Sequence, residues 1–250
     1  MEAFLDVTIL PQPDLTTCGP TCLHAVYQYY GDDIPLAQVI DEVKSLETGG
    51  TLDVFLACHA LRRGYKARIY TYNLQVFDPS WFLHGPDYIA ARLLAQMEAK
   101  DDAKLHLATR GYLDFLSLGG ELRFADLTPA LLRKYLKRSI PVLTGLSSTY
   151  LYRSMREYGD LCEDDDVRGA PSGHFVLLCG YNRPDRVVAI ADPPMGNPMS
   201  AGQNYEVSID RVICAILLGI VTYDANLLII EPGEPPRKKG NGRANHTVTA

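Results

Sequence analysis

Hydrophobic residues recur with helical spacing through the first half of this sequence and with strand spacing through the second half. Helical stretches carry apolar residues three and four positions apart, and strand stretches are short apolar or alternating runs. Because helices and strands are segregated rather than alternating, the pattern predicts an α+β domain and not a chain of βαβ units. We expect helices near residues 18–30, 35–43, 51–63, 88–117 and 128–138, and strands near residues 4–10, 65–72, 140–146, 174–181, 186–191, 215–223 and 227–230.

The chain has the size and composition of an average globular protein. It has 250 residues, of which 47% are hydrophobic and 22% charged, enough to bury a core without disulfides or metal. No apolar run reaches the roughly 18 residues of a membrane span, and the N-terminus lacks the features of a secretory signal. We therefore predict one domain over residues 1–231 with no membrane partner. The basic, Pro- and Gly-rich tail over residues 232–250 is expected to be disordered.

Charge is distributed unevenly along the chain. The fourteen residues from Arg237 to Ala250 carry four Lys and Arg and no acidic residue, which leaves twenty basic against thirty acidic side chains in residues 1–236. A body with this net negative charge repels phosphate backbones, so we expect no nucleic-acid partner. The six cysteines are scattered rather than densely paired. Without a secretory signal they indicate reduced thiols in a cytoplasmic protein.

Cys18 is the cysteine whose position best suits a nucleophile. Pro20 is acceptable only in the first turn of a helix and Gly31 stops the helix, so Cys18 lies at a helix N-terminus. The aligned peptide dipoles there favour the thiolate, which is the reactive form of the side chain. Cys22, one turn later, falls on the apolar face, and we interpret it as a core residue. A buried structural thiol is the alternative for Cys18 itself.

A histidine and a carboxylate come together at the open end of a predicted hairpin. The strands 174–181 and 186–191 flank the turn 182–185. A constant index sum across the hairpin pairs His174 with a residue near Asp192, and directly opposed side chains share a face about 5 Å apart. Such a pair can act as a general base held by an acid. A slip of one residue would put Asp192 on the other face, and a strand-edge histidine beside a turn aspartate is the alternative.

Gln12 lies six residues before Cys18, between Pro11 and Pro13. A side-chain amide near the nucleophile, together with a backbone N–H group at the helix start, can stabilise an oxyanion. A solvated loop glutamine is the alternative interpretation of Gln12.

Other catalytic arrangements find little support in the sequence. No His-Glu-x-x-His motif is present, and Cys18, Cys22 and His24 on one helix make a poor zinc set, so we expect no metal and no cofactor. Ser147 lacks the second glycine of a nucleophile elbow. The other histidines have no visible partner pattern, and we interpret them as surface or core residues: His24, His59, His84 and His106.

The order of these motifs resembles that of C39-like peptidases, a branch of the papain-like cysteine peptidases. The resemblance rests on Gln12, TCGPTCLHAVYQYYG (17–31), GHFVLLCGYN (173–182) and IADP (190–193), and it leaves residues 73–127 unassigned. It implies Cys18 as nucleophile, His174 as base, Asp192 as orienting acid and Gln12 as oxyanion-hole donor. It also implies a papain-like fold, in which a helical N-terminal half carrying the cysteine packs on an antiparallel sheet carrying the histidine and the aspartate.

The activity implied by the resemblance is cysteine-dependent hydrolysis of peptide or amide bonds through an acyl-enzyme intermediate. Members that cleave leader peptides during export are joined to membrane spans and an ATPase. This sequence has no such spans and no Walker motif, so we expect a stand-alone peptidase or amidase. Two alternatives stay open, namely transfer of the acyl group to an amine and a non-catalytic module that binds a peptide in the same cleft.

The segment 157–169 is acidic and closely precedes the strand that carries His174. We expect it to be a loop that borders the cleft. Its position and charge predict a preference for basic or amine-bearing substrates.

Overall fold

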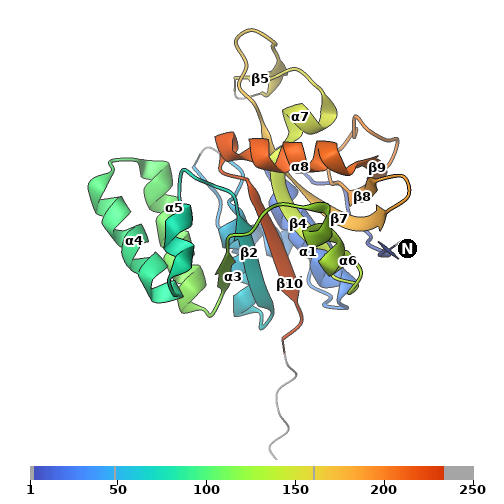
Figure 1. The fold of residues 1–250 in the computed structure, drawn as a ribbon. Coiled ribbons are helices and arrows are strands. Elements are labelled where there is room, and N and C mark those ends of the chain that lie inside the picture. The colour runs from blue at the N-terminus through green and yellow to red at the C-terminus, as the bar shows by residue number, and fades with distance from the viewer. Residues whose placement is uncertain (1–2, 48, 160, 234–250) are drawn as a thin grey trace, which may run out of the picture.

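A large sheet with helices on both faces organises the fold (Figure 1). The computed structural model describes residues 3–47, 49–159 and 161–233. Neighbouring strands follow the order β3-β2-β10-β4-β7-β8-β9, with β1 beside β7, and a separate hairpin pairs β5 with β6. The strands are β1 (Ala3–Phe4), β2 (Lys66–Thr71), β3 (Glu121–Arg123), β4 (Val142–Ser147), β5 (Glu157–Tyr158), β6 (Glu163–Asp164), β7 (Gly173–Asn182), β8 (Val187–Ala191), β9 (Asn204–Ser208) and β10 (Asn226–Glu231).

The helices divide between two hydrophobic cores, one on each face of the sheet. Helices α1 to α5 contribute to one core, and α6 to α8 contribute to the other. The helices are α1 (Cys18–Tyr29), α2 (Leu36–Glu42), α3 (Asp53–Arg62), α4 (Pro86–Ala99), α5 (Ala103–Ser117), α6 (Pro129–Leu136), α7 (Ser148–Tyr152) and α8 (Ile209–Leu218), with the short 3-10 helices η1 (Pro79–Leu83) and η2 (Gly219–Thr222).

Strand β7 is buried on both faces, which explains its nearly continuous apolar sequence. Phe175 belongs to the first core together with Leu23 of α1, and Val176 belongs to the second together with Ile216 of α8. A strand covered on both sides needs apolar residues at successive positions rather than at alternate ones. Strand β7, which carries His174, therefore also lies at the centre of the hydrophobic packing.

The architecture confirms the predicted α+β class, with helices from the first half of the chain packed on the sheet. The sheet was predicted to be antiparallel, and it is so wherever β1, β2, β4, β7, β8, β9 and β10 pair with one another. At one edge β3 runs parallel to β2. The chain between them forms η1, α4 and α5, and a long helical crossover of this kind returns the chain in the same direction. This crossover contains most of the segment 73–127 that the motifs left unassigned.

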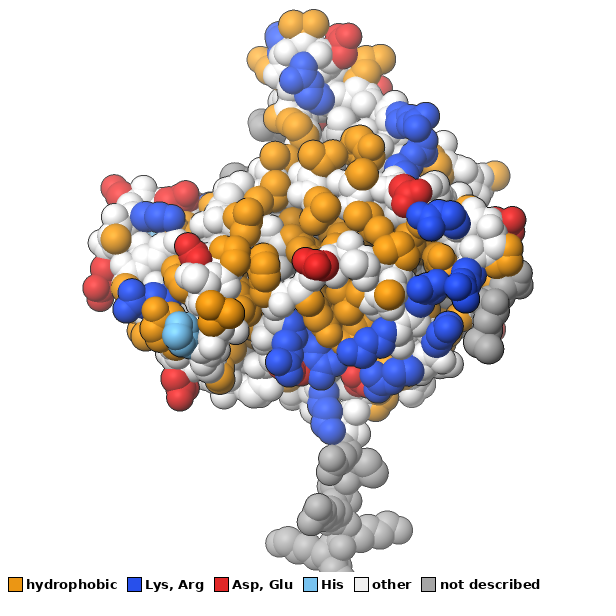
Figure 2. All heavy atoms as spheres, in the orientation of Figure 1, with side chains coloured by type: hydrophobic (Ala, Val, Ile, Leu, Met, Phe, Trp, Pro, Cys, Tyr) orange, Lys and Arg blue, Asp and Glu red, His pale blue; other side chains and the backbone are white. Residues whose placement is uncertain are grey.

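The strand predicted over residues 215–223 is wrong. This segment continues α8 and then forms η2. The apolar run carries no clear period, because α8 buries Ala215 and Ile216 yet leaves Leu217 and Leu218 partly exposed. Short apolar runs of this kind do not distinguish a helix from a strand. Figure 2 shows hydrophobic side chains gathered across the face of the molecule that α8 occupies.

The strand predicted over residues 4–10 is wrong for most of its length. Only Ala3 and Phe4 pair with β7 as strand residues, and the Leu5 N–H then donates to the Cys179 carbonyl. The alternation of burial nevertheless continues, since Val7 and Ile9 are buried. The pattern therefore predicted which side chains face the core, but not the strand pairing.

Two expectations concern the ends and the surroundings of the domain. The predicted disordered tail (232–250) lies outside the described residues from position 234 onward, so its disorder and the domain boundary at residue 231 stay predictions. Within the described part of the chain, no helix combines the length and the apolar character that crossing a membrane requires.

Leu23 tests whether the packing of α1 on the sheet stabilises the fold. Its side chain is fully buried in the first core, so Leu23→Ala should lower the free energy of unfolding by about 2–5 kcal/mol. Chemical denaturation measures this change. The matched control is Leu15→Ala, because Leu15 is 68% exposed. Equal losses in the two variants would contradict the packing described here.

Candidate active site

Cys18 is the first residue of α1. The preceding Thr17 makes no side-chain capping bond, and among the described residues no acidic side chain lies in the first turn. The N–H groups at the start of the helix therefore keep their partial positive charge close to the thiol. Cys18 retains 8% of its surface, so the residue is buried but not completely enclosed.

Gly19 allows the start of α1 to approach the sheet closely. A Cβ atom at this position would lie 2.6 Å from Thr51 Cγ2 and 3.2 Å from Phe175 Cδ2. Phe175 directly follows His174 on β7. The absence of a side chain at Gly19 thus brings the cysteine end of α1 to the histidine end of β7.

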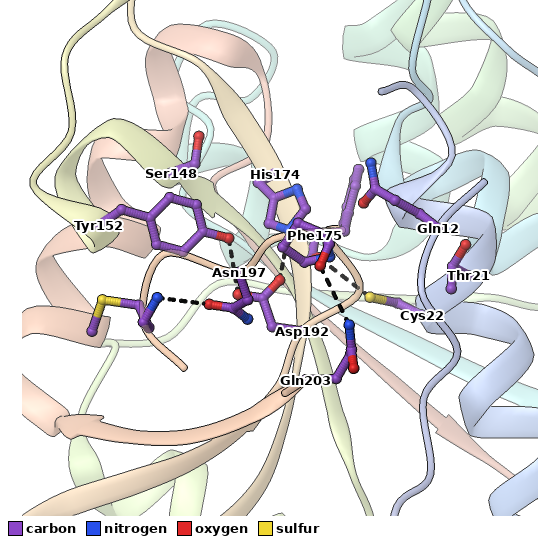
Figure 3. A network of polar contacts seen from close by, with 12 residues as sticks. Gln12, Thr21, Cys22, Ser148, Tyr152, His174, Phe175, Asp192, Asn197 and Gln203 are labelled. Carbon is purple, nitrogen blue, oxygen red and sulfur yellow. Dashed lines mark hydrogen bonds and ion pairs between the residues drawn. The ribbon is translucent and has the colours of Figure 1, made fainter. Parts of the chain in front are cut away.

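His174 and Asp192 form a buried hydrogen-bonded pair (Figure 3). The distance from His174 Nε2 to Asp192 Oδ1 is 2.8 Å, and the exposed side-chain fractions are 10% and 0% respectively. His174 lies near the start of β7, and Asp192 directly follows β8. The structure therefore joins the two residues that the hairpin argument brought together.

A β-bulge in β7 determines the face on which Asp192 lies. The register with β8 shifts by one residue between Leu178 and Gly180. Beyond the shift, the register places Asp192 level with Val176, which shares a face with His174. Without the shift, Asp192 would face the opposite core. His174 and Asp192 are therefore diagonal neighbours on one face and not the directly opposed pair that we expected.

Two tyrosines that the sequence analysis missed hold the second oxygen of Asp192. The Tyr152 hydroxyl donates to Asp192 Oδ2 at 2.9 Å, and the Tyr205 hydroxyl donates to the same oxygen at 2.5 Å. In Figure 3 the Tyr152 hydroxyl and the His174 ring both point toward Asp192. Hydrogen bonds of this kind stabilise a buried carboxylate in its ionised form. Tyr205 lies on β9, a strand that we did not predict, and Tyr152 lies on the short helix α7.

The surroundings of His174 favour its protonated form. Burial opposes the charged ring, but the negative charge of Cys18 and the charge of Asp192 outweigh it. Hydrogen bonds from the ring to Asp192 and Cys18 act in the same direction, and together they raise the pKa of His174 to about 10. This arrangement favours the imidazolium form of the ring beside Cys18.

Gln12 is buried rather than solvated. Its backbone N–H donates to the Pro193 carbonyl at 2.8 Å, which ties this loop to the residue after Asp192. Its side-chain Nε2 donates to the Asp14 carbonyl at 2.6 Å. A primary amide carries two N–H groups, so one of them is left for another acceptor.

The structure assigns ordinary roles to other candidates that the sequence raised. Cys22 is a core residue, as predicted, and its thiol donates to the Phe175 carbonyl at 3.3 Å. Burial raises the pKa of Cys22, with smaller contributions from Cys18 and Asp192. Ser147 accepts a hydrogen bond from the Tyr150 N–H at the start of α7, which is a capping role.

His59 is a core histidine with partners from two other helices. Its Nδ1 lies 2.7 Å from the Tyr27 hydroxyl, and its Nε2 lies 2.9 Å from Glu42 Oε2. Burial lowers the pKa of His59, and Glu42 opposes this change. The group links α1, α2 and α3 away from the Cys18 site.

Comparison with known proteins defines the fold. No protein-family model and no curated protein matches the chain. A structure from Bacillus anthracis assigned as a C39-like peptidase is similar with a TM-score of 0.50 and 14% identity, over 92% of this chain and 97% of that one. This likeness bears out the C39-like resemblance at the level of the fold, and the chain has a papain-like fold.

More distant likenesses involve two further proteases. A double glycine motif protease from an AMS/PCAT transporter, solved with its leader peptide, has a TM-score of 0.44 and 14% identity over 92% of this chain and 94% of that one. Xylellain, a cysteine protease from Xylella fastidiosa, has a TM-score of 0.45 and 12% identity over 92% and 85%.

The titration of His174 tests the electrostatics of the site. We expect the ring to stay protonated until about pH 10 in the wild type. Cys18→Ser should lower this pKa, because it removes the charge that raises it most. NMR of the imidazole signals measures both values, and His106, which is not in contact with the site, is the internal control. A folded-state pKa above the ordinary value stabilises the fold fully below about pH 6.5. That contribution should be lost as the pH rises toward 10, and a wild-type ring titrating near 6.5 would contradict this account.

Proposed function

We propose that this chain is a cysteine-dependent hydrolase of peptide or amide bonds. One observation carries the proposal. The thiol at the start of a helix interacts with a buried imidazole, whose far nitrogen is held by a carboxylate that is itself fully buried. A nucleophile, a base and an orienting acid in this order are the elements of a catalytic triad. The papain-like fold supports the same function.

In the first half of the reaction, the Cys18 thiolate attacks the carbonyl carbon of the scissile bond. A C–S bond forms, and the carbonyl π electrons move to the oxygen. The backbone N–H of Cys18 and the second N–H of the Gln12 amide are the proposed donors to this oxyanion. The His174 imidazolium then gives its proton to the amine nitrogen as the C–N bond breaks, leaving an acyl group on Cys18.

In the second half, water replaces the amine. The neutral His174 takes a proton from water, and the resulting hydroxide attacks the thioester carbon. The C–S bond breaks with its electrons returning to sulfur, so that the acid product leaves and the thiolate and imidazolium are restored. An amine in place of water gives the transferase alternative by the same steps.

Asp192 has the role of fixing the ring. It accepts a hydrogen bond from His174 Nε2, which leaves the other nitrogen for the sulfur and the leaving amine. Its second oxygen is occupied by the hydroxyls of Tyr152 and Tyr205, so the carboxylate cannot rotate freely. This degree of orientation favours catalysis over the non-catalytic binding alternative, which would need no held base.

Selective alkylation of Cys18 tests the proposed function. With limiting iodoacetamide at pH 6, we expect Cys18 to react at least about tenfold faster than Cys214, because an exposed ordinary thiol is almost wholly protonated at that pH. Peptide mapping by mass spectrometry gives both rates in one sample, and Cys214 is an exposed thiol that serves as the matched control. The variant His174→Ala should remove the advantage of Cys18.

Cleavage of a peptide library completes that test. Products that gain the mass of water indicate hydrolysis, and products joined to an added amine indicate transfer. Cys18→Ala should abolish both reactions. Slow alkylation of Cys18 that does not depend on His174, together with no turnover, would contradict the proposal and favour a binding module.

We also propose that the substrate is basic or carries an amine near the scissile bond. The predicted loop 157–169 contains the short hairpin β5–β6, which projects from the body of the molecule (Figure 1). Its base is linked to the segment that precedes the candidate base, because the Ser172 hydroxyl donates to Glu157 Oε1 at 2.9 Å and Ser172 lies two residues before His174. Asp165 is used internally, since it pairs with Arg168. The exposed residues Glu163, Asp164 and Asp166 are therefore the acidic ones that can face a substrate.

Charge reversal on the hairpin tests this preference. In the double variant Glu163→Lys and Asp164→Lys, we expect the ratio of kcat/KM for a Lys-containing peptide over its Glu-containing analogue to fall at least about threefold, and less at high salt. Paired peptide assays at two ionic strengths measure the ratio. Asp87→Lys with Glu98→Lys, two exposed positions on α4, is the control of equal charge change. A similar fall in the control would contradict a local effect.

A cytoplasmic location belongs to the proposal as well. It is supported by Cys18, Cys22, Cys58 and Cys179, which are buried free thiols.

A further inference from the structure

A second buried carboxylate lies behind the histidine of the candidate site. Asp224 follows η2 and precedes β10, and only 6% of its surface is exposed. Its backbone is fixed, because its N–H donates to the Gly219 carbonyl at 2.8 Å and its carbonyl accepts from the Asn226 N–H at 2.7 Å. The preceding Tyr223 has a φ of 73°, a conformation that costs free energy for a residue with a side chain. The chain is thus held in a strained turn that directs Asp224 inward.

Two glycines on the central strands make room for this carboxylate. A Cβ atom on Gly145 of β4 would lie 2.7 Å from the Cβ of Asp224. A Cβ atom on Gly173 of β7 would lie 2.1 Å from Asp224 Oδ2 and 2.6 Å from Thr222 Oγ1. Gly173 is the residue immediately before His174. Neither position can carry a side chain while Asp224 occupies this place, so the carboxylate rests directly against the backbone of the histidine strand.

The groups that interact with Asp224 or with its neighbour Asp53 come from several elements, and they include the buried Tyr112 hydroxyl of α5. On α3, Asp53 contributes a second buried carboxyl, and on α5, Lys104 contributes a positive charge. On β7, His174 contributes the imidazole, and on η2, Thr222 contributes a hydroxyl. The Lys104 ammonium also donates to the Thr222 carbonyl at 3.3 Å. The ring of His174 itself is faced by Cys18 from α1, Asp192 after β8 and Tyr152 from α7.

These surroundings act differently on the pKa values of the two buried carboxyls, Asp53 and Asp224. Burial raises the pKa of Asp53 to about 8, and the charge of Asp224 adds to this rise. Burial raises the pKa of Asp224 to about 7, whereas the Thr222 hydroxyl, Lys104 and His174 favour its ionised form. Asp224 is therefore the carboxyl of the pair whose ionised form is favoured by a hydroxyl, an ammonium and an imidazole around it.

We propose that Asp224 is a positioning residue that holds a negative charge against the His174 strand and stabilises the imidazolium of the Cys18–His174 pair. This inference rests on the function proposed above. The interaction between two titrating groups is reciprocal, so an imidazolium that favours ionised Asp224 is favoured by it to the same extent. Asp192 orients the ring through a direct hydrogen bond, whereas Asp224 acts through its charge, from the backbone side of the strand.

Removing the charge of Asp224 tests the inference. Asp224→Asn should lower the His174 pKa by about one unit, measured by NMR of the imidazole. The upper transition in the pH profile of Cys18 alkylation should move down by the same amount. Thr222→Val is the milder second variant. It removes a hydroxyl that favours the ionised carboxylate, so it should move both readouts in the same direction by less.

The variant Asp53→Asn distinguishes a charge effect from general damage to the buried cluster. It replaces a carboxyl whose pKa is raised by burial and by Asp224 with a neutral amide and leaves the charge of Asp224 in place, so the His174 pKa should not fall. If all three variants lowered the His174 pKa alike, or if Asp224→Asn and Thr222→Val left it unchanged, the inference would be overturned.

The same measurements separate failure of the inference from failure of the proposed function. If Cys18 is alkylated fast at pH 6 and this rate depends on His174 but not on Asp224, only the proposed role of Asp224 is contradicted. If Cys18 reacts slowly and independently of His174, both proposals are lost.

Discussion

The hydrogen bond between His174 and Asp192 is the interaction on which the candidate site depends. A buried imidazole without a partner would lose its proton, since burial disfavours the charged ring. The pair places a full negative charge on one side of the ring and leaves the other side for Cys18. Removing Asp192 would leave a buried cation with less compensation, which is more costly than losing an exposed ion pair. The surrounding fold supplies what this one contact requires.

Both halves of the chain contribute the contacts that hold His174 and Asp192 in place. Tyr152 and Tyr205 fix the carboxylate from the α7 and β9 side, and the backbone of Gln12 reaches the residue after Asp192 from the helical side. Glycines at positions 19 and 173 remove the side chains that would keep α1 and Asp224 at a distance. The hydrogen bonds restrict the orientation of the side chains, and the glycines allow the elements to approach each other. Orientation is a large part of what a protein contributes to a covalent reaction.

Local features of the sequence could predict the parts of the site that depend on neighbours in the chain. Pro20 and Gly31 delimit the first helix and so place Cys18 at its start, and the turn 182–185 defines the hairpin that carries His174. The bulge between Leu178 and Gly180 could not be predicted from neighbouring residues, because it arises from how β7 pairs with β8. The prediction of a shared face for His174 and Asp192 is correct only because that bulge corrects the register.

Features that depend on tertiary contacts escaped prediction for the same reason. The stretch 215–221 is apolar on its exposed side as well as on its buried side, so this part of the sequence shows no period. Asp224 follows that run as an ordinary loop aspartate, and its burial depends on glycines about 50 and 80 residues earlier in the chain. The sequence predicted the alternating burial over residues 4–10, but it did not predict which strand this segment pairs with.

The most direct test of the central claim is a crystal structure of the protein with a peptide aldehyde bound. We predict a covalent hemithioacetal on Cys18, with its oxygen about 3 Å from the Gln12 Nε2 and from the Cys18 N–H. The His174 ring should lie between the sulfur and Asp192. An aldehyde that fails to bond to Cys18, or an adduct whose sulfur is turned away from the His174 ring, would contradict the account.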